Sequence, residues 1–289
     1  MYTMRPAPFS YHRPASLDEA IALLGDGDSM PLAGGHSLLP MMKLRLATPA
    51  ALVDLAGIAG LDEIGSNGDG LTIGALATHA DVALSPVVGG RCRVLAETAA
   101  GIGDRQVRNR GTIGGSIAHA DPAADYPTVL TALGATIVVG GGGGEREIAA
   151  DDFFRGIFTT ALEQGELVTA VRVPATSAGT GAAYEKHRHP ASLYAVVGVA
   201  AVVTVENGTC THAKVAIGGV TERPVVATAV AEALVGASIS PDAIQAAAGK
   251  AGDALAEPLS DTYASGEYRK HLASVLVRRA LTRAVERTE

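Results

Sequence analysis

The chain has 289 residues, 47% of them hydrophobic and 18% charged, which excludes a disordered chain and leaves room for two or more folded units. Its 23 basic and 30 acidic residues give a net charge of −7, which argues against binding to nucleic acid or to an anionic membrane. The only cysteines are Cys92 and Cys210. An iron–sulfur cluster needs about four thiolates, so this chain cannot hold one alone.

The N-terminus has prolines and arginines where a secretory signal would have an apolar run. The longest nearly apolar stretch, residues 193–205, has 13 residues and is shorter than the roughly 18 that a membrane-spanning helix needs. Few cysteines and no signal are typical of a reducing compartment. We therefore expect a cytoplasmic protein without a membrane span.

Short helices and strands alternate in the first part of the chain. Ser16 and Glu19 predict a capping box at a helix start, and Thr78 is placed to cap a later helix. In chain order the patterns predict a helix over 16–24, a strand over 30–33 leading into Gly34 and Gly35, a helix over 41–46, and strands over 51–55 and 70–76.

The middle of the chain contains the longest irregular polar stretch, residues 101–127. Five consecutive glycines, Gly140 to Gly144, are interpreted as a mobile hairpin loop. The small residues 175–182 predict a linker with a domain boundary near residue 176. Around these features the patterns predict helices over 87–101 and 127–133, the second with Pro127 at its first position, a strand pair over 135–148, and a strand ending at Pro174.

After the linker the pattern changes to strands followed by helices. Asn207 and Gly208 form a tight hairpin signal between the second and third of three predicted strands. The strands are expected over 182–188, 193–209 and 210–220, and the helices over 227–236, 241–255 and 267–287, the last with an apolar side of Tyr268, Leu272, Val275, Leu276 and Leu281. The C-terminal unit is therefore predicted to be a sheet backed by helices.

Two glycine turns are the candidate binding sites. Ala33 to Ser37 and Thr112 to Ser116 each place two glycines and a hydroxyl residue before a helix, where backbone amides can converge on an anion. Neither turn has the lysine of a P-loop or the spacing of a Rossmann dinucleotide site. Each is also compatible with an ordinary strand-to-helix turn. Together, two such turns can hold the two phosphates of one dinucleotide.

Four segments resemble the FAD-binding medium subunit of aerobic carbon monoxide dehydrogenase, within the xanthine dehydrogenase family of molybdenum hydroxylases. They are the segments that begin at Pro31 and Val107, the strand at 165–174 and the segment at 184–198. The likeness covers nearly the whole chain. It implies an α+β fold with a vanillyl-alcohol-oxidase-type FAD-binding domain over 1–176, in subdomains of about 1–56 and 57–176. A smaller domain with a three-stranded sheet and a helix bundle is implied over 177–289.

The resemblance also implies the residues that contact FAD. The two turns would wrap the pyrophosphate from opposite sides, Asp125 would contact the ribityl or phosphate region, and Lys186 and Tyr194 would lie near the flavin ring. No catalytic residue and no metal ligand is assigned in this chain. The implied FAD-binding residues are Leu32, Ala33, Gly34, Gly35, His36, Ser37, Leu38, Ile102, Thr112, Ile113, Gly114, Gly115, Ser116, Asp125, Val168, Thr169, Lys186 and Tyr194.

In function, the resemblance implies the flavoprotein subunit of a heterotrimeric oxidoreductase, assembled as a dimer of heterotrimers. A large subunit would carry the molybdenum cofactor and oxidise carbon monoxide, an aldehyde or an N-heterocycle. A small subunit with two [2Fe–2S] clusters would pass electrons to FAD in this chain, and FAD would pass them to an external acceptor. That acceptor could bring the complex to the inner face of the membrane. The alternatives are a free-standing FAD-dependent oxidoreductase and a nucleotide-binding regulator.

Several other polar residues keep two interpretations. His36 can cap a helix or contact phosphate, and His119 with Asp121 fits a loop better than a metal site because no third ligand follows at metal spacing. His187 and His189 fit either a solvated loop or the edge of the flavin.

Overall fold

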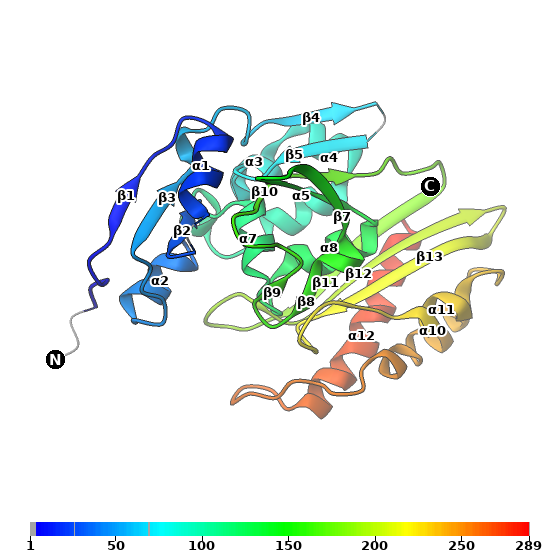
Figure 1. The fold of residues 1–289 in the computed structure, drawn as a ribbon. Helices are drawn as coiled ribbons and strands as arrows, with labels where there is room; N and C mark the ends of the chain where they lie inside the picture. Colours follow the sequence, from blue (N-terminus) through cyan, green and yellow to red (C-terminus); the bar gives the residue numbers. More distant parts are fainter. Residues whose placement is uncertain (1–3, 26, 69, 289) are drawn as a thin grey trace.

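The computed structural model describes residues 4–25, 27–68 and 70–288. Figure 1 shows three parts along the chain: a small sheet at the left, a larger sheet with helices in the middle, and a third sheet with the C-terminal helices at the lower right. Within the described ranges, no helix is both long enough and apolar enough to cross a lipid bilayer.

The N-terminal part is a parallel three-stranded sheet with the order β1-β3-β2. Its apolar face packs against the first helix in a small core of Ala20, Leu24, Val53, Leu55 and Ile58 with Leu167 from a distant strand. The elements are β1 (Ser10–His12), α1 (Leu17–Leu24), β2 (Ser29–Leu32), α2 (Leu38–Lys43), β3 (Ala51–Asp54) and the 3₁₀ turn η1 (Leu55–Gly57).

Two local predictions in this part need correction. Ser16 caps α1, but the Glu19 carboxylate accepts from the amide of Ala15 at 3.0 Å, not from that of Ser16, so the reciprocal capping box does not form. The second helix starts at Leu38 and ends at Lys43, not at 41–46. It stops because Arg45 adopts a left-handed conformation with φ of 61°.

The central part is an antiparallel five-stranded sheet with the order β4-β5-β10-β6-β7. One side of it packs against a group of helices in the largest core of the chain. The strands are β4 (Ile64–Asn67), β5 (Gly70–Gly74), β6 (Thr136–Gly141), β7 (Gly144–Ala149) and β10 (Leu167–Val173), beside a small hairpin of β8 (Phe154–Gly156) and β9 (Thr159–Thr160). The helices are α3 (His79–Leu84), α4 (Pro86–Arg91), α5 (Arg93–Ala100), α6 (Arg105–Arg108), α7 (Ile113–His119), α8 (Asp125–Leu133) and α9 (Ala150–Phe153).

The predicted irregular stretch contains ordered helices. Asp104 caps α6 and Thr112 caps α7, so the second glycine turn is the first turn of a helix. The predicted helix over 87–101 is two helices, α4 and α5, separated at Cys92. Helix α8 begins at Asp125, which puts Pro127 at its third position.

The run of five glycines is mostly strand. Gly140 and Gly141 belong to β6 and Gly144 to β7, so the turn itself consists of Gly142 and Gly143. Hydrogen bonding across the hairpin thus orders three of the glycines that were interpreted as loop. The mobility of the remaining pair stays a prediction.

The C-terminal part has the antiparallel order β11-β12-β13-β14, with one short strand more than the three predicted. Asn207 and Gly208 have φ of 51° and 78°, which confirms the tight hairpin. The strands are β11 (Thr180–Arg188), β12 (Ala195–Glu206), β13 (Thr209–Gly218) and β14 (Val225–Val226), and the helices are α10 (Thr228–Leu234), α11 (Pro241–Ala248), the 3₁₀ turn η2 (Ala251–Ala254) and α12 (Gly266–Val285).

The buried side of α12 agrees only in part with the predicted one: Leu276 and Leu281 are buried as expected, but Tyr268 is not. Tyr268 is 45% exposed, whereas Arg269 is buried and donates to the carbonyl oxygens of Val196 and Gly219. The remaining buried residues are mostly small, and they allow the helix to lie close to β11 and β12: Gly266, Ala273, Leu276, Val277, Ala280, Leu281 and Ala284. A search for large apolar residues finds Leu276 and Leu281 but misses the alanines that form much of this face.

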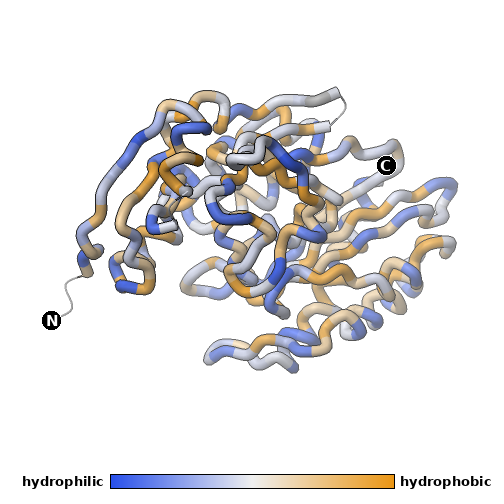
Figure 2. Tube along the Cα trace, viewed as in Figure 1, coloured by the Kyte–Doolittle hydropathy of each residue, from blue (hydrophilic) through white to orange (hydrophobic). Residues whose placement is uncertain are grey.

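Helix α8 joins the central and C-terminal parts. All nine of its residues are buried, and it packs against β12 and β13 of the C-terminal sheet. Ala200, Val202 and Ala216 of these strands belong to the same core as the central sheet. Figure 2 shows hydrophobic residues gathered along the inner strands, with hydrophilic residues along the outer loops and helix faces.

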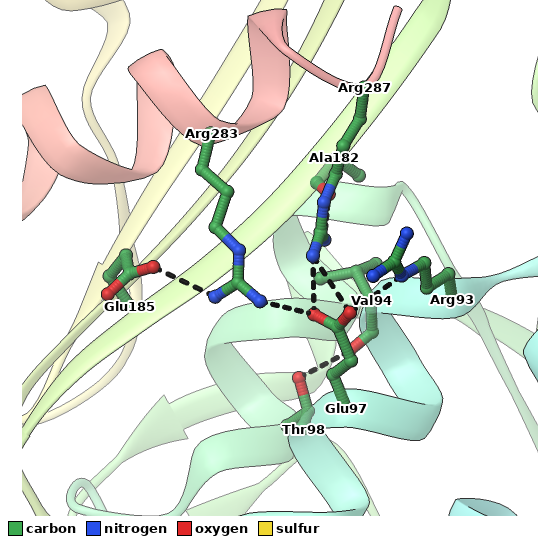
Figure 3. Close-up of polar contacts among 8 residues, drawn as sticks. All are labelled: Arg93, Val94, Glu97, Thr98, Ala182, Glu185, Arg283 and Arg287. Carbon is green, nitrogen blue, oxygen red and sulfur yellow. Dashed lines mark hydrogen bonds and ion pairs between the residues drawn. The ribbon is translucent and has the colours of Figure 1, made fainter.

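A cluster of ion pairs also joins the central part to the C-terminal part. Figure 3 shows Glu97 of α5 facing Arg283 of α12 and Arg287 just beyond it, at N···O distances of 3.0 and 2.8 Å. Arg93 also pairs with Glu97, and Arg283 reaches Glu185 of β11. Burial alone would raise the pKa of Glu97, but hydrogen bonds from Arg287 and Arg93 outweigh it and hold the pKa below its usual value.

Candidate cofactor site

Both glycine turns open onto one cleft of about 550 Å³. Its walls come from the N-terminal sheet, the central helices and the β11–β12 turn. The predicted residues that line it are Ala33, Gly34, Gly35, His36, Ser37, Leu38, Ile102, Thr112, Gly114, Gly115, Ser116, Asp125, Val168 and Tyr194. Residues far apart in the sequence therefore meet at one site.

The first turn presents its backbone to the cleft. Gly35 has φ of 74°, a conformation that glycine adopts without strain, and its carbonyl accepts from Leu39 to start α2. Within the described part of the chain, the amides from Ala33 to Leu38 make no hydrogen bond to the protein. Ser37 makes no capping bond with its side chain either. This turn therefore has donors free for an anion.

Close contact between the two loops explains Gly34. A Cβ atom at this position would lie 2.1 Å from the carbonyl oxygen of Arg110 and 2.7 Å from the Cα of Gly111. Only a glycine permits the backbone of the first turn to pack directly on the loop that precedes the second. Gly34 thus fixes the spacing between the two turns.

The second turn uses its amides within the protein. The amides of Ile113 and Gly114 donate to the carbonyls of Ala77 and Ala75 at 3.0 and 2.8 Å, and that of Gly115 donates to the Thr112 hydroxyl at 3.1 Å. A Cβ at Gly114 would lie 2.4 Å from the Cβ of Ala75. Here glycine is needed for packing after β5, so the two turns are not equivalent anion cradles.

Asp125 lies at the base of the cleft and is paired inside the protein. Its carboxylate accepts from Lys186 Nζ at 2.8 Å and from the Tyr184 hydroxyl at 2.6 Å. Both charged side chains are only 5% exposed. Burial raises the pKa of Asp125, and Lys186 and Tyr184 oppose that rise. Lys186 does not line the cleft, so its place is behind Asp125.

The other predicted residues divide between the wall and its support. Ile102 lines the cleft, and its loop is held by Arg108, which donates to the carbonyls of Ile102 and Gly103 at 2.9 and 2.8 Å. Val168 also lines the cleft. The residues outside the lining are Leu32, Ile113, Thr169 and Lys186. Of these, Ile113 is fully buried and Thr169 donates to the carbonyl of Val138 at 3.3 Å.

Tyr194 lies at the mouth of the cleft and is 43% exposed. Partial burial raises the pKa of its hydroxyl, and the negative charges of Asp121 and Asp125 add to the effect. The phenol therefore stays neutral across the physiological pH range and is available as a flat, amphipathic surface.

Several other residues of the wall were not predicted to line a cofactor site. His79, just after the Thr78 cap, is buried, and burial lowers its pKa to about 4, so its ring is neutral. The ring of His119 lies 4.8 Å from that of Phe158. Both rings line the cleft, and so does Asp121. Only tertiary packing brings these residues to the site.

Comparison with known proteins agrees with this architecture. Residues 7–176 match the family model of the FAD binding domain in molybdopterin dehydrogenase, and residues 182–284 match that of the CO dehydrogenase flavoprotein C-terminal domain. The chain belongs to the medium, FAD-binding subunits of the molybdenum hydroxylase family. The resemblance found in the sequence is thus confirmed, and so is the fold that it implied.

Two relatives and one crystal structure show how far this likeness extends. The carbon monoxide dehydrogenase medium chain of Afipia carboxidovorans is 40% identical over 99% of this chain and 100% of its own. The glyceraldehyde dehydrogenase medium chain of Sulfolobus acidocaldarius is 38% identical over 96% and 98%. A chain in the crystal structure of the Cu,Mo-CO dehydrogenase, cyanide-inactivated form, superposes with a TM-score of 0.93 at 40% identity over 97% of this chain and 99% of that one.

Proposed function

We propose that FAD binds in the cleft between the two glycine turns and that the first turn holds its pyrophosphate. The main support for this proposal is that the amides from Ala33 to Leu38 have no partner among the described residues and lie beside the Ser37 hydroxyl. Backbone amides and a hydroxyl are the donors that a phosphate accepts. The match to an FAD binding domain over residues 7–176 supports the proposal that this anion is the pyrophosphate of FAD.

The second turn has a different proposed role. Thr112 and Ser116 line the same cleft and bring hydroxyl groups to it, while the amides between them hold α7 against the end of β5. This turn would fix the opposite wall and leave the anion mainly to Ala33–Leu38. Leu32, Ile113 and Thr169 would support the wall from behind.

The charge near the flavin follows from the Asp125 pair. FAD supplies the capacity to accept and release electrons, and this chain's residues bind and orient it and shield it from water. Lys186 and Asp125 together have no net charge, whichever of them holds the proton, because they form one buried pair. The pair therefore adds no net positive charge beside the flavin. We propose instead that the pair fixes the base of the cleft.

We further propose that this chain works as the medium subunit of a dimer of heterotrimers. A large subunit would bear the molybdenum cofactor, and a small subunit would bear two [2Fe–2S] clusters and pass electrons to this chain. Carbon monoxide is the proposed substrate of the large subunit. The support is that this chain aligns nearly end to end with a carbon monoxide dehydrogenase medium chain. The domain division at 176, with subdomains of about 1–56 and 57–176, remains part of this proposal.

Ligand competition tests the cofactor site. We expect the purified chain to bind FAD, ADP to compete with it, and riboflavin to compete poorly, because riboflavin lacks the phosphates. Flavin fluorescence during titration measures all three. Equal affinity for riboflavin and FAD would contradict an amide cradle for the pyrophosphate, and absence of FAD binding would overturn the proposed function.

Native mass of the complex tests the assembly. We expect the chain to co-purify with two other subunits when it is expressed with its neighbouring genes. A free species of 29.2 kDa that turns over substrate alone would favour a free-standing FAD oxidoreductase. A colourless chain that binds nucleotide but no flavin would favour a nucleotide-binding regulator.

A further inference from the structure

Tyr194 is positioned by a short turn between β11 and β12. In this turn, defined by residues 189–194, the His189 amide donates to the Tyr194 carbonyl at 2.8 Å, and the Leu193 amide donates to the His189 carbonyl at 2.9 Å. Leu193 has φ of 62° and so adopts a conformation that is unfavourable for leucine. A leucine stays there only when surrounding contacts determine the backbone.

The His189 side chain supplies two of these contacts. Its Nδ1 atom accepts from the amides of Ala191 and Ser192 at 3.2 and 3.3 Å. A ring nitrogen can accept only while it carries no proton, and imidazolium is a donor at both nitrogens. The geometry thus requires the neutral ring with the proton on Nε2. Protonation would remove both hydrogen bonds and place a donor against two donors.

Few charged groups stand close to this ring. Tyr263 packs on it with a centroid distance of 4.6 Å, and the Asp261 carboxylate lies within its electrostatic reach. Asp261 is itself paired with Arg269 of α12. The titratable and charged residues just before it in the chain are His187 and Arg188 at the end of β11. The ring of His187 also faces Tyr263. Another charged group contacts the turn itself: Lys186 Nζ donates to the Leu193 carbonyl oxygen at 3.1 Å.

We propose that His189 is a positioning residue for Tyr194, and that its neutral ring holds the 189–194 turn in the form that keeps Tyr194 at the cleft. Protonation of His189 loosens this turn and lets the tyrosine move. The part of the inference that concerns the flavin rests on the proposed function, because it needs FAD in the cleft beside Tyr194. The part that concerns the turn stands on the hydrogen bonds alone.

Hydrogen exchange of the full chain tests the turn. Histidine changes its charge between about pH 5 and 8, so peptides covering 189–195 are compared at those two limits after correction for intrinsic exchange. We expect protection of the Ala191 and Ser192 amides to fall roughly tenfold at the acidic limit, as loss of a hydrogen-bond acceptor predicts. Unchanged protection would overturn the inference.

Two variants separate this effect from general acid sensitivity. His189→Asn keeps a side-chain acceptor that does not titrate, so the turn should stay protected at both limits. His187→Asn removes the neighbouring imidazole, which makes no hydrogen bond to the turn, and should retain the wild-type pH response. A pH response that survives in His189→Asn, or disappears in His187→Asn, would assign the switch to another group and contradict the proposal.

The FAD dissociation constant, measured with the same proteins, tests the link to the cofactor. We expect it to rise several-fold toward the acidic limit in the wild type and to stay flat in His189→Asn. If exchange responds to pH while FAD affinity does not, the positioning of the turn stands and the contact between Tyr194 and FAD fails. If FAD does not bind at either limit, the proposed function fails on its own.

Discussion

The two glycine turns look alike in sequence and differ in what their backbones do. The amides from Ala33 to Ser37 make no hydrogen bond to described residues of the protein, whereas the turn from Thr112 to Ser116 donates four amides to carbonyl and hydroxyl groups of the protein. Gly34 permits contact with the neighbouring loop, and Gly114 permits contact with Ala75 at the end of β5.

The difference shows that a glycine pair is not by itself an anion site. In the first turn the residues line the cleft, and their amides make no hydrogen bond to described residues of the protein. In the second, the missing side chains allow a helix to start against a sheet. Loss of the Ser37 hydroxyl in the first turn should therefore affect binding of the cofactor, whereas substitutions in the second turn should affect stability even in the protein without FAD.

Gly114→Ala should have the largest effect. The new Cβ would meet the Ala75 Cβ at 2.4 Å, so α7 must move, and overpacking of this kind costs about 1–3 kcal/mol. Urea unfolding of the protein without FAD measures it. Gly90→Ala in α4 is the matched control because a Cβ there meets nothing within 4 Å. Equal stability of the two variants would contradict the packing role of Gly114 in the second turn.

Ser37→Ala should weaken FAD binding without changing the stability of the protein that lacks FAD. Its hydroxyl makes no capping bond, and a hydrogen bond to a charged group contributes about 1.5–3 kcal/mol, so affinity should fall about tenfold or more. Flavin titration measures the affinity, and urea unfolding without FAD should give the wild-type value. A loss of stability as large as the loss of affinity would contradict a free hydroxyl.

Thr112→Ala should lower the stability of the protein rather than its affinity for FAD. It removes the acceptor of the Gly115 amide, and loss of such an N-cap costs about 1 kcal/mol in the free energy of unfolding. The cost should be present without FAD, and Thr112→Ser should restore most of it. If Thr112→Ala changes only FAD affinity, the second turn binds the cofactor as the first does.

Glu97→Gln should be the smallest change and affects neither turn. Because the folded pKa of Glu97 is lowered, its contribution to stability is present above its unfolded value of about 4.3 and is lost as the pH falls through the folded value. The variant should be slightly less stable at neutral pH and should lose less stability on acidification. Unfolding at several pH values measures this, and FAD affinity should stay at the wild-type value.

Much of the fold follows from local sequence signals. Thr78 caps α3 as expected, with Asp81 completing a capping box that was not predicted, and Asn207-Gly208 forms the expected hairpin, because both signals act within four residues. The same is true of β10, which runs to Val173 before Pro174. The α+β class was predictable because these elements occur in a mixed order.

The helices of the irregular stretch could not be predicted in this way. Helix α7 begins Ile113-Gly114-Gly115, a poor local helix former, and it exists because its first amides bond to carbonyls near the end of β5. The Asp125–Lys186 pair joins positions 61 residues apart. Resemblance named these residues, but only the structure shows that Lys186 lies behind Asp125. His79 had no sequence signal at all, since nothing near it points to a cleft.

The packing of α8 has a consequence for how this protein can be divided. Family boundaries treat residues 7–176 and 182–284 as two modules. Ala200, Val202 and Ala216 nevertheless complete the core around α8, and Lys186 and Tyr184 complete the base of the cleft. Each matched segment is thus smaller than the packed unit, whose core and cleft need residues from both. The first module, produced alone, would expose an apolar helix face and leave a buried carboxylate without its partner.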